Sequence, residues 1–456
     1  MSDQTRAYMT IRQAAFIGVG AMVGAGIFSL LGAAGEVAGA AVWLSFVLAG
    51  CIAGLQGYSF AKLGAKYPSA GGLLEYVAQG FGPGHITRIT AWLTYAVNAI
   101  ITAMVASSFG SYASAAFAGG SVTWTKIFAA LIIVVMTIVN IVGSQFVARA
   151  QTVIVVVVIG SLSVFAIATL LNINPQLLAP SGYPPLRAIV SSVALTFFAF
   201  LGFGIVTFTA KDLKDPAREL PTAMYLALGI AAVVYVAVSL GVFGTLTVEQ
   251  VIASGGTAIA VAAEPVLGKA GYWMMSLVAL FATSGATNAG LYPAQGLCEQ
   301  LVETKQFPPV MARKFAGRAS SGLIFVSLIC IVLVVGFDVN AIASIGSAVA
   351  LAVFGMVTIA HLRVREVTGA NIGVLVLALA TVAIALLAFV FTELIYEPAS
   401  MLALLVILLL SVGLDLAWTR SRDSSSGGRA GMTGMPAASA EPAGESSGAV
   451  PRAEDT

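Results

Sequence analysis

Gly18-Val-Gly-Ala-Met-Val-Gly-Ala-Gly-Ile-Phe28 is the stretch that decides the fold, because it lies in the first long apolar segment and carries four glycines. A glycine inside a helix costs about 1 kcal/mol relative to alanine. The segment is therefore predicted to form a membrane helix that is unwound or thinned in its middle. Within a bilayer an unwound backbone is tolerated only where it lines a cavity or is buried in protein.

A second weak point, Phe197-Phe-Ala-Phe-Leu-Gly-Phe-Gly204, follows five apolar segments later. Broken helices at matching positions of two halves are the best sequence indication of a transporter's binding site. The pair therefore predicts a transporter whose substrate site lies between these two segments.

The composition places the chain in a membrane. It has 456 residues, of which 59% are hydrophobic and 9% are charged, whereas a soluble domain has about 25% charged residues. The three cysteines lie in apolar segments and predict no disulfide framework. The N-terminal apolar run is long and lacks a small-residue cleavage site, so we expect a retained span rather than a signal peptide.

Apolar stretches long enough to span a bilayer divide the chain into three parts. We expect a cytoplasmic N-terminus at residues 1–10, a transporter domain at 11–420 and a disordered cytoplasmic tail at 421–456, which is rich in Ser, Gly, Ala and Pro. The twelve predicted spans are 11–33, 38–61, 86–117, 124–143, 150–172, 188–210, 221–246, 270–302, 321–337, 339–361, 371–391 and 399–418. The polar stretch 248–266 fits an external loop with a short helix.

The basic residues set the orientation. With the N-terminus inside, the inner segments hold 19 of the 22 lysines and arginines, and only Lys126, Arg187 and Lys269 lie outside. An excess of basic residues marks cytoplasmic loops, so both termini are expected in the cytoplasm. Spans one and six would each begin a five-span half, which gives an all-α fold with a five-plus-five inverted repeat, discontinuous helices one and six, and two extra C-terminal helices.

Four motifs carry a family resemblance over roughly residues 10–420. They are Gly20-Ala-Met-Val-Gly-Ala-Gly-Ile-Phe28, Lys66-Tyr-Pro-Ser-Ala-Gly-Gly72, Phe197-Phe-Ala-Phe-Leu-Gly-Phe203 and Lys214-Asp-Pro-Ala-Arg-Glu-Leu-Pro221. With these four motifs in this order, the chain resembles the amino acid–polyamine–organocation (APC) superfamily of permeases, which have the leucine-transporter-type fold. Two positions depart from the pattern: Gly204 stands where many members carry an acid, and Thr152–Val164 lacks the lysine of some proton-coupled members.

The turn at Gly24-Ala25-Gly26 predicts the substrate site. A helix N-terminus with free N–H groups binds a carboxylate, and carbonyls at the end of the inner half-helix accept from an ammonium group. A neutral amino acid would satisfy both ends without a buried charged side chain. The predicted binding residues are Val19, Gly20, Met22, Gly24, Ala25, Gly26, Ile27, Phe198, Phe200, Gly202 and Phe203. The alternative for the glycines is close helix packing through Gly20-xxx-Gly24.

Phe203, which follows the glycine of the second break, is the preferred gate among the phenylalanines of that segment, although such residues also pack helices. The resemblance adds further pocket candidates. Asn98 and Thr102 in the third span, and Ser344 and Ser347 in the tenth, would lie near the pocket or hydrogen-bond between helices. Thr283, Ser284 and Thr287 in the eighth span, with Asn288, would form a sodium site, its uncharged remnant or a packing contact.

The remaining features predict no enzyme. The chain has no metal-ligand spacing, no phosphate-binding loop and no nucleophile–base motif. Glu36, Glu299, His361 and Asp415 lie near span ends, where snorkelling to water explains them.

We therefore expect a plasma-membrane permease that moves amino acids by alternating access. It would have no cofactor beyond a coupling proton or sodium ion, no nucleic-acid partner and an undetermined oligomeric state. The alternatives are a channel, against which stands the lack of an acidic or hydroxyl ring for a filter, and a transport-inactive amino acid sensor.

Overall fold

The computed structural model describes residues 8–69, 72–142, 145–303, 307–315, 319–396, 402, 404–417 and 419, so the predicted tail 421–456 lies outside the described residues. The described chain is helical except for a two-residue antiparallel pair, β1 (Lys314–Phe315) and β2 (Ala319–Ser320).

The helices follow one another in this order: α1 (Ile11–Ala25), α2 (Ile27–Ala38), η1 (Gly39–Ala41), α3 (Val42–Lys66), α4 (Leu73–Phe81), α5 (His85–Phe117), α6 (Val122–Val142), α7 (Gln145–Leu171), η2 (Pro175–Leu178), η3 (Pro180–Gly182), α8 (Leu186–Phe198), η4 (Leu201–Asp212), α9 (Pro216–Phe243), α10 (Val248–Ser254), η5 (Gly255–Thr257), α11 (Ala258–Glu303), η6 (Pro309–Ala312), α12 (Ser321–Gly336), α13 (Val339–Arg363), α14 (Arg365–Thr368) and α15 (Ile372–Tyr396). A last apolar helix covers Leu404–Ala417.

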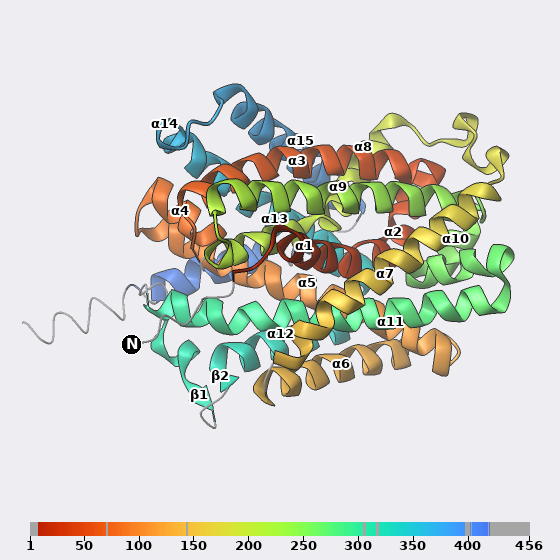
Figure 1. Ribbon diagram of the computed structural model, residues 1–456, viewed down its shortest axis with the longest axis horizontal. Coiled ribbons are helices and arrows are strands. Elements are labelled where there is room, and N and C mark those ends of the chain that lie inside the picture. Colours follow the sequence, from red (N-terminus) through yellow and green to blue (C-terminus); the bar gives the residue numbers. More distant parts are fainter. Residues whose placement is uncertain are drawn as a thin grey trace, which may run out of the picture.

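The long helices run side by side along the long axis of the molecule (Figure 1). In the described chain, eight helices are long and apolar enough to cross a membrane, and four shorter apolar helices accompany them. The short elements α4, α14, β1 and β2 lie at one end of the bundle and α10 lies at the other (Figure 1). The protein is therefore an all-α, multi-pass membrane protein.

The first helix is interrupted over a narrower stretch than its glycines suggest. An exposed capping box between Thr10 and Gln13 starts α1, and the helix then runs through Gly18 and Gly24 to Ala25. Only Gly26 separates it from α2, with φ −84° and ψ −66°. Packing around the first glycines offsets their low helix propensity. The predicted unwinding is therefore reduced to a kink at Gly26, whose amide still donates to the Met22 carbonyl at 2.8 Å.

The second interruption changes the type of helix. After α8 ends at Phe198, the chain continues as the twelve-residue 3₁₀-helix η4. Runs of 3₁₀-helix longer than three or four residues are uncommon, and within a helix they often mark a hinge or strain. The predicted weak point at Phe200–Gly204 therefore coincides with the junction of α8 and η4.

The interrupted helices lie in the core of the bundle. The apolar windows of α5, α8–η4 and α13 are 78%, 78% and 83% buried, whereas that of α6 is only 17% buried. Helix α1 packs against α9, η4 and α11, and α3 packs against α8 and α9. Both interruptions are thus shielded from lipid, as irregular backbone in a membrane requires.

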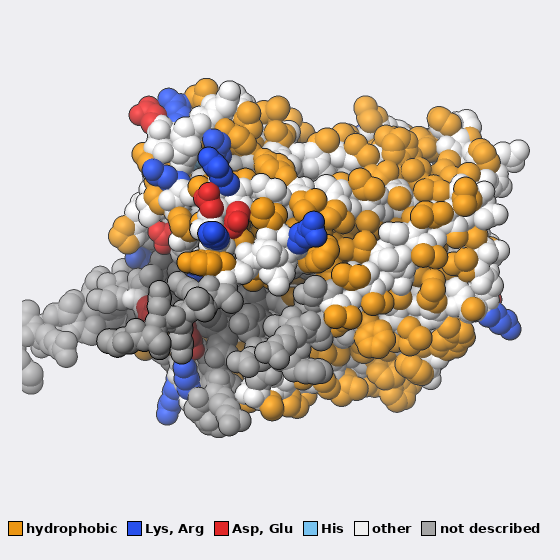
Figure 2. Space-filling view, in the orientation of Figure 1, with side chains coloured by type: hydrophobic (Ala, Val, Ile, Leu, Met, Phe, Trp, Pro, Cys, Tyr) orange, Lys and Arg blue, Asp and Glu red, His pale blue; other side chains and the backbone are white. Residues whose placement is uncertain are grey.

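Charged side chains gather over the end of the molecule that carries α4 and α14, while apolar side chains cover the rest of this face (Figure 2). The apolar cover includes exposed valines on α7, such as Val153 and Val157. This separation of a charged end from an apolar belt is the distribution expected of a protein embedded in a bilayer.

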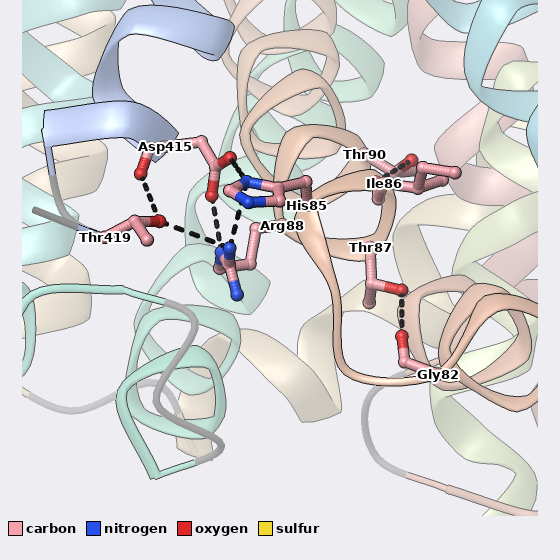
Figure 3. Close-up of polar contacts among 8 residues, drawn as sticks. All are labelled: Gly82, His85, Ile86, Thr87, Arg88, Thr90, Asp415 and Thr419. Carbon is pink, nitrogen blue, oxygen red and sulfur yellow. Dashed lines mark hydrogen bonds and ion pairs between the residues drawn. The ribbon is translucent and has the colours of Figure 1, made fainter. Parts of the chain in front are cut away.

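Asp415 does not snorkel to water as its sequence position suggests. Its side chain is 1% exposed and its carboxylate is 2.5 Å from Nδ1 of His85. It also accepts from Nε of Arg88, and Nη2 of Arg88 donates to the Thr419 hydroxyl at 3.2 Å (Figure 3). The prediction for Asp415 is wrong because a guanidinium group on α5 lets the carboxylate stay buried on the last helix.

His361 also departs from the snorkelling prediction. Its side chain is fully buried near the end of α13, where Nε2 lies 2.9 Å from the hydroxyl of Thr368. The other two predicted interface residues do reach the surface. Glu36 is exposed, and Glu299 is partly exposed with a carboxylate oxygen 3.6 Å from Nζ of Lys314.

Candidate functional site

The interruption of α1 lies directly against the end of α8. A methyl group added to Gly26 would lie 2.7 Å from Cα of Ala199 and 2.8 Å from the hydroxyl oxygen of Tyr235. Real side chains do not approach so closely, so the backbones of the two helix ends touch only because residue 26 has no side chain.

A second glycine makes the reciprocal contact. A methyl group on Gly202, in the first turn of η4, would lie 2.7 Å from the carbonyl carbon of Ala21 and 2.7 Å from the amide nitrogen of Met22. The start of η4 therefore rests on the α1 backbone one turn before Gly26. Together the two glycines hold the interruptions side by side.

The glycines of α1 do not share one role. Gly18 faces Val206 and Ala227, and Gly24 faces Ala282 and Ala286 of α11. Of the predicted packing pair, Gly24 makes a close helix contact, as Gly18 also does, whereas Gly20 lines a small cavity. Gly26 faces the end of α8.

The second half of α1 lies against a small, partly open apolar cavity. Its walls come from α1, α7 and α11 and are apolar: Val19, Gly20, Val23, Gly24, Ile154, Val155, Val158, Ile159 and Ala282. Val19, Gly20 and Gly24 thus line a space between α1, α7 and α11, whereas Gly26 and Met22 take part in the contact with α8 and η4. Among the predicted binding residues of α1, Val19, Gly20 and Gly24 therefore face a different neighbour from Met22 and Gly26.

The phenylalanines around the second interruption point in three directions. Phe200 packs edge-on against Tyr235, with ring centres 5.0 Å apart. Phe198 lies against Gly346 and Ile100, between α13 and α5.

Phe203 is fully buried and packs against Phe60 and Phe354, with ring centres 5.2 and 5.4 Å apart. A residue so enclosed opens a path only if α3 or α13 moves. Its predicted role as a gate therefore requires helix movement.

The polar candidates of α5 join two helices. Asn98 donates from Nδ2 to the carbonyl of Gly290 on α11 at 2.8 Å, and the Thr102 hydroxyl donates to the Asn98 carbonyl at 2.8 Å. A methyl group on Gly290 would collide with the Thr102 side chain. Both side chains therefore stabilise the contact between α5 and α11 in this state.

The hydroxyls of the predicted ion site bond within their own helix. Thr283, Ser284 and Thr287 donate to the carbonyls of the residues four, three and four positions earlier, at 2.7, 3.0 and 2.8 Å. Each hydroxyl oxygen keeps lone pairs for a cation. The nearby cavity is lined on α11 by Ala282 rather than by these oxygens.

Three buried hydroxyl groups lie near the interruptions, and sequence reasoning missed two of them, those of Tyr235 and Ser29. Tyr235 of α9 reaches the gap between Gly26 and Ala199. Ser29, in the first turn of α2, and Ser347, next to Gly346, have hydroxyls without a hydrogen-bond partner in the described part of the chain. Only Ser347 was among the residues suggested by the family resemblance; a lone tyrosine or serine in an apolar segment gives no sequence signal.

A sequence profile of the amino acid permease family matches residues 10–416. The chain belongs to this family. This permease is 29% identical over 408 residues to the inner membrane transport protein YbaT of Escherichia coli, with 89% of this chain and 95% of YbaT covered.

The names of two further relatives state a substrate. Cationic amino acid transporter 2 of Arabidopsis thaliana, a vacuolar protein, is 26% identical over 79% of this chain and 60% of its own length. The methylthioribose transporter of Bacillus subtilis is 28% identical over 50% of this chain and 53% of its own length. Family and relatives agree that the permease is a membrane transporter and not an enzyme.

Proposed function

We propose that this permease moves amino acids across the plasma membrane by alternating access, with the substrate bound beside the contact of the α1 and α8 interruptions. The observation that carries the proposal is the reciprocal glycine contact, in which Gly26 faces Ala199 and Gly202 faces Met22. Two interrupted helices that meet inside a bundle are the arrangement in which transporters bind substrate. The corresponding topology has twelve spans, a five-plus-five inverted repeat and both termini in the cytoplasm.

The chemistry of the two interruptions favours a neutral amino acid. The start of α2 offers the positive end of a helix dipole to the carboxylate, and carbonyls at the ends of α1 and α8 suit the ammonium group. Ala21, Met22, Ala199, Gly202 and Tyr235, which meet there, carry no charge. A cationic side chain would lack a carboxylate partner at these positions, so we place the permease apart from its relatives named for cationic substrates.

Uptake by purified permease in proteoliposomes tests this proposal. A thermal-shift screen against the twenty amino acids and methylthioribose first selects ligands, because a ligand that binds the folded state raises its melting temperature. Saturable uptake that is accelerated by unlabelled substrate inside the vesicles supports a carrier. Stabilisation by methylthioribose alone, or by arginine and lysine alone, would overturn the neutral substrate class, and non-saturating conductance would overturn alternating access.

The composition of α7 limits the ways in which amino acid transport can be coupled to an ion. No ionisable side chain occurs between Thr152 and Val164, and the described residues of α7 that face α1 are valine and isoleucine. This part of the bundle therefore offers no proton carrier. The proposal is exchange of amino acids, or coupling to sodium or protons through another group.

A further inference from the structure

The hydroxyl group of Tyr235 occupies the point where the two interruptions meet. Tyr235 lies in α9, is fully buried and donates to the carbonyl of Ala199 at 2.9 Å. The same oxygen would lie 2.8 Å from a methyl group on Gly26. One hydroxyl from a third helix thus contacts both helix ends.

Tyr235 supplies a hydrogen bond that the interruption removes. In an unbroken α-helix the amide of Phe203 would donate to the Ala199 carbonyl, but it donates to the Phe200 carbonyl at 3.0 Å instead. A buried carbonyl without a donor costs about 1–3 kcal/mol. The tyrosine therefore stabilises the change from α8 to η4.

The ring of Tyr235 packs against two phenylalanines, and these contacts limit the movement of its hydroxyl. Phe46 of α3 lies at a ring-centre distance of 5.3 Å, and Phe200 lies at 5.0 Å. A side chain held in this way connects α9 and α3 to the two interruptions with little freedom to move.

We propose that Tyr235 is a positioning residue that holds the α1 and α8 interruptions in register, and that it thereby sets the affinity for substrate. The effect on substrate affinity rests on the proposed function, whereas the positioning role does not. A ligand that needs both helix ends in one geometry binds more weakly when that geometry is populated less often. Removing the hydroxyl lowers this population without altering any charge.

Tyr235→Phe removes the hydroxyl and keeps the ring, and Tyr95→Phe is the matched control. The Tyr95 hydroxyl is also buried and donates to a carbonyl of another helix, that of Gly322 at 2.7 Å, but it joins α5 to α12. Hydrogen–deuterium exchange of peptides covering residues 196–212 reports how often the backbone around Ala199 opens, and it needs no ligand. We expect exchange there to rise about fivefold or more in Tyr235→Phe alone. Unchanged exchange, or an equal rise in Tyr95→Phe, overturns the positioning role.

The transport measurement then tests the link to affinity. For the amino acid that the wild type transports, we expect KM to rise about fivefold to tenfold in Tyr235→Phe, with Vmax unchanged, which is the effect of losing about one hydrogen bond. Tyr95→Phe should keep the wild-type KM. A wild-type KM in Tyr235→Phe overturns the link to affinity. If the wild type binds no amino acid while the exchange difference holds, the proposed substrate class fails and the positioning role stands.

Discussion

The backbone of Met22 is the surface on which Gly202 packs: a methyl group at residue 202 would lie 2.7 Å from the Met22 amide nitrogen. The contact joins the first interrupted helix to the second without any side chain on the η4 side. A backbone-to-backbone contact cannot adapt by changing a rotamer, so its geometry is sensitive to a single added carbon.

Gly202→Ala is therefore expected to abolish or strongly reduce uptake. The added methyl group must push η4 away from α1, because the atoms it meets belong to the backbone. Gly204→Ala is the matched control, since a methyl group there meets only a Phe60 ring carbon at 4.0 Å. Uptake and surface expression of both variants check this, and equal uptake by the two variants would contradict it.

Gly26→Ala is expected to lose substrate binding and to lower the melting temperature. The methyl group would collide with Ala199 and with the Tyr235 hydroxyl. Gly54→Ala, on α3, meets no atom within 4 Å and should keep binding while gaining up to about 1 kcal/mol of helix propensity. Thermal melts with and without substrate separate the two effects. Retained binding by Gly26→Ala would mean that the substrate lies elsewhere.

The sequence predicted where the two helix interruptions lie, because glycines cluster between Gly18 and Gly26 and again at Gly202 and Gly204. That the substrate binds there stays a prediction. The sequence did not predict which glycine interrupts the helix, since Gly18 and Gly24 remain helical where small residues of neighbouring helices pack against them. Tyr235 was missed because a single tyrosine among valines gives no periodic signal. Asp415 was assigned to the interface because its partner Arg88 is 327 positions away, and pairing over such a separation is invisible in one sequence.

Asp415→Asn is expected to destabilise the permease by about 3 kcal/mol, because it leaves the largely buried Arg88 without its counter-charge. The ion pair joins α5 to the last apolar helix (Figure 3). Asp215→Asn is the control: its carboxylate is more than half exposed and 4.0 Å from Arg218, so its loss should change stability little. Thermal melts in detergent compare the two, and equal melting temperatures would show that the buried pair adds nothing.

The orientation of the chain is tested by cysteine labelling. The excess of basic residues inside predicts that a cysteine at Ser424 reacts with a membrane-impermeant reagent only after permeabilisation. Ala253→Cys, exposed on α10 at the end of the bundle opposite α4 and α14 (Figure 1), should react in intact cells. The native Cys51, Cys298 and Cys330 are first replaced by alanine. Labelling at residue 424 in intact cells would contradict the topology and the inverted repeat with it.

The coupling ion is tested with imposed gradients in proteoliposomes. The hydroxyl oxygens of Thr283 and Ser284 are neutral ligands, which suit sodium better than a titrating proton. If they bind sodium, a sodium gradient should drive accumulation in the wild type, and the double variant Thr283→Ala/Ser284→Ala should lose that response. Exchange of labelled for unlabelled substrate without a gradient should persist in the variant.

Thr169→Ala is the control for the loss of a buried hydroxyl, because Thr169 donates to the Phe165 carbonyl of its own helix at 2.8 Å, as Thr283 does to that of Ala279 at 2.7 Å. Both changes remove the same kind of local hydrogen bond, so only a bound cation distinguishes their effects on sodium dependence. If a proton gradient alone drives accumulation and the double variant behaves like Thr169→Ala, the sodium site is wrong. Glu299, Glu36 and the charged segment after η4 then become the first positions to replace in the search for the proton carrier.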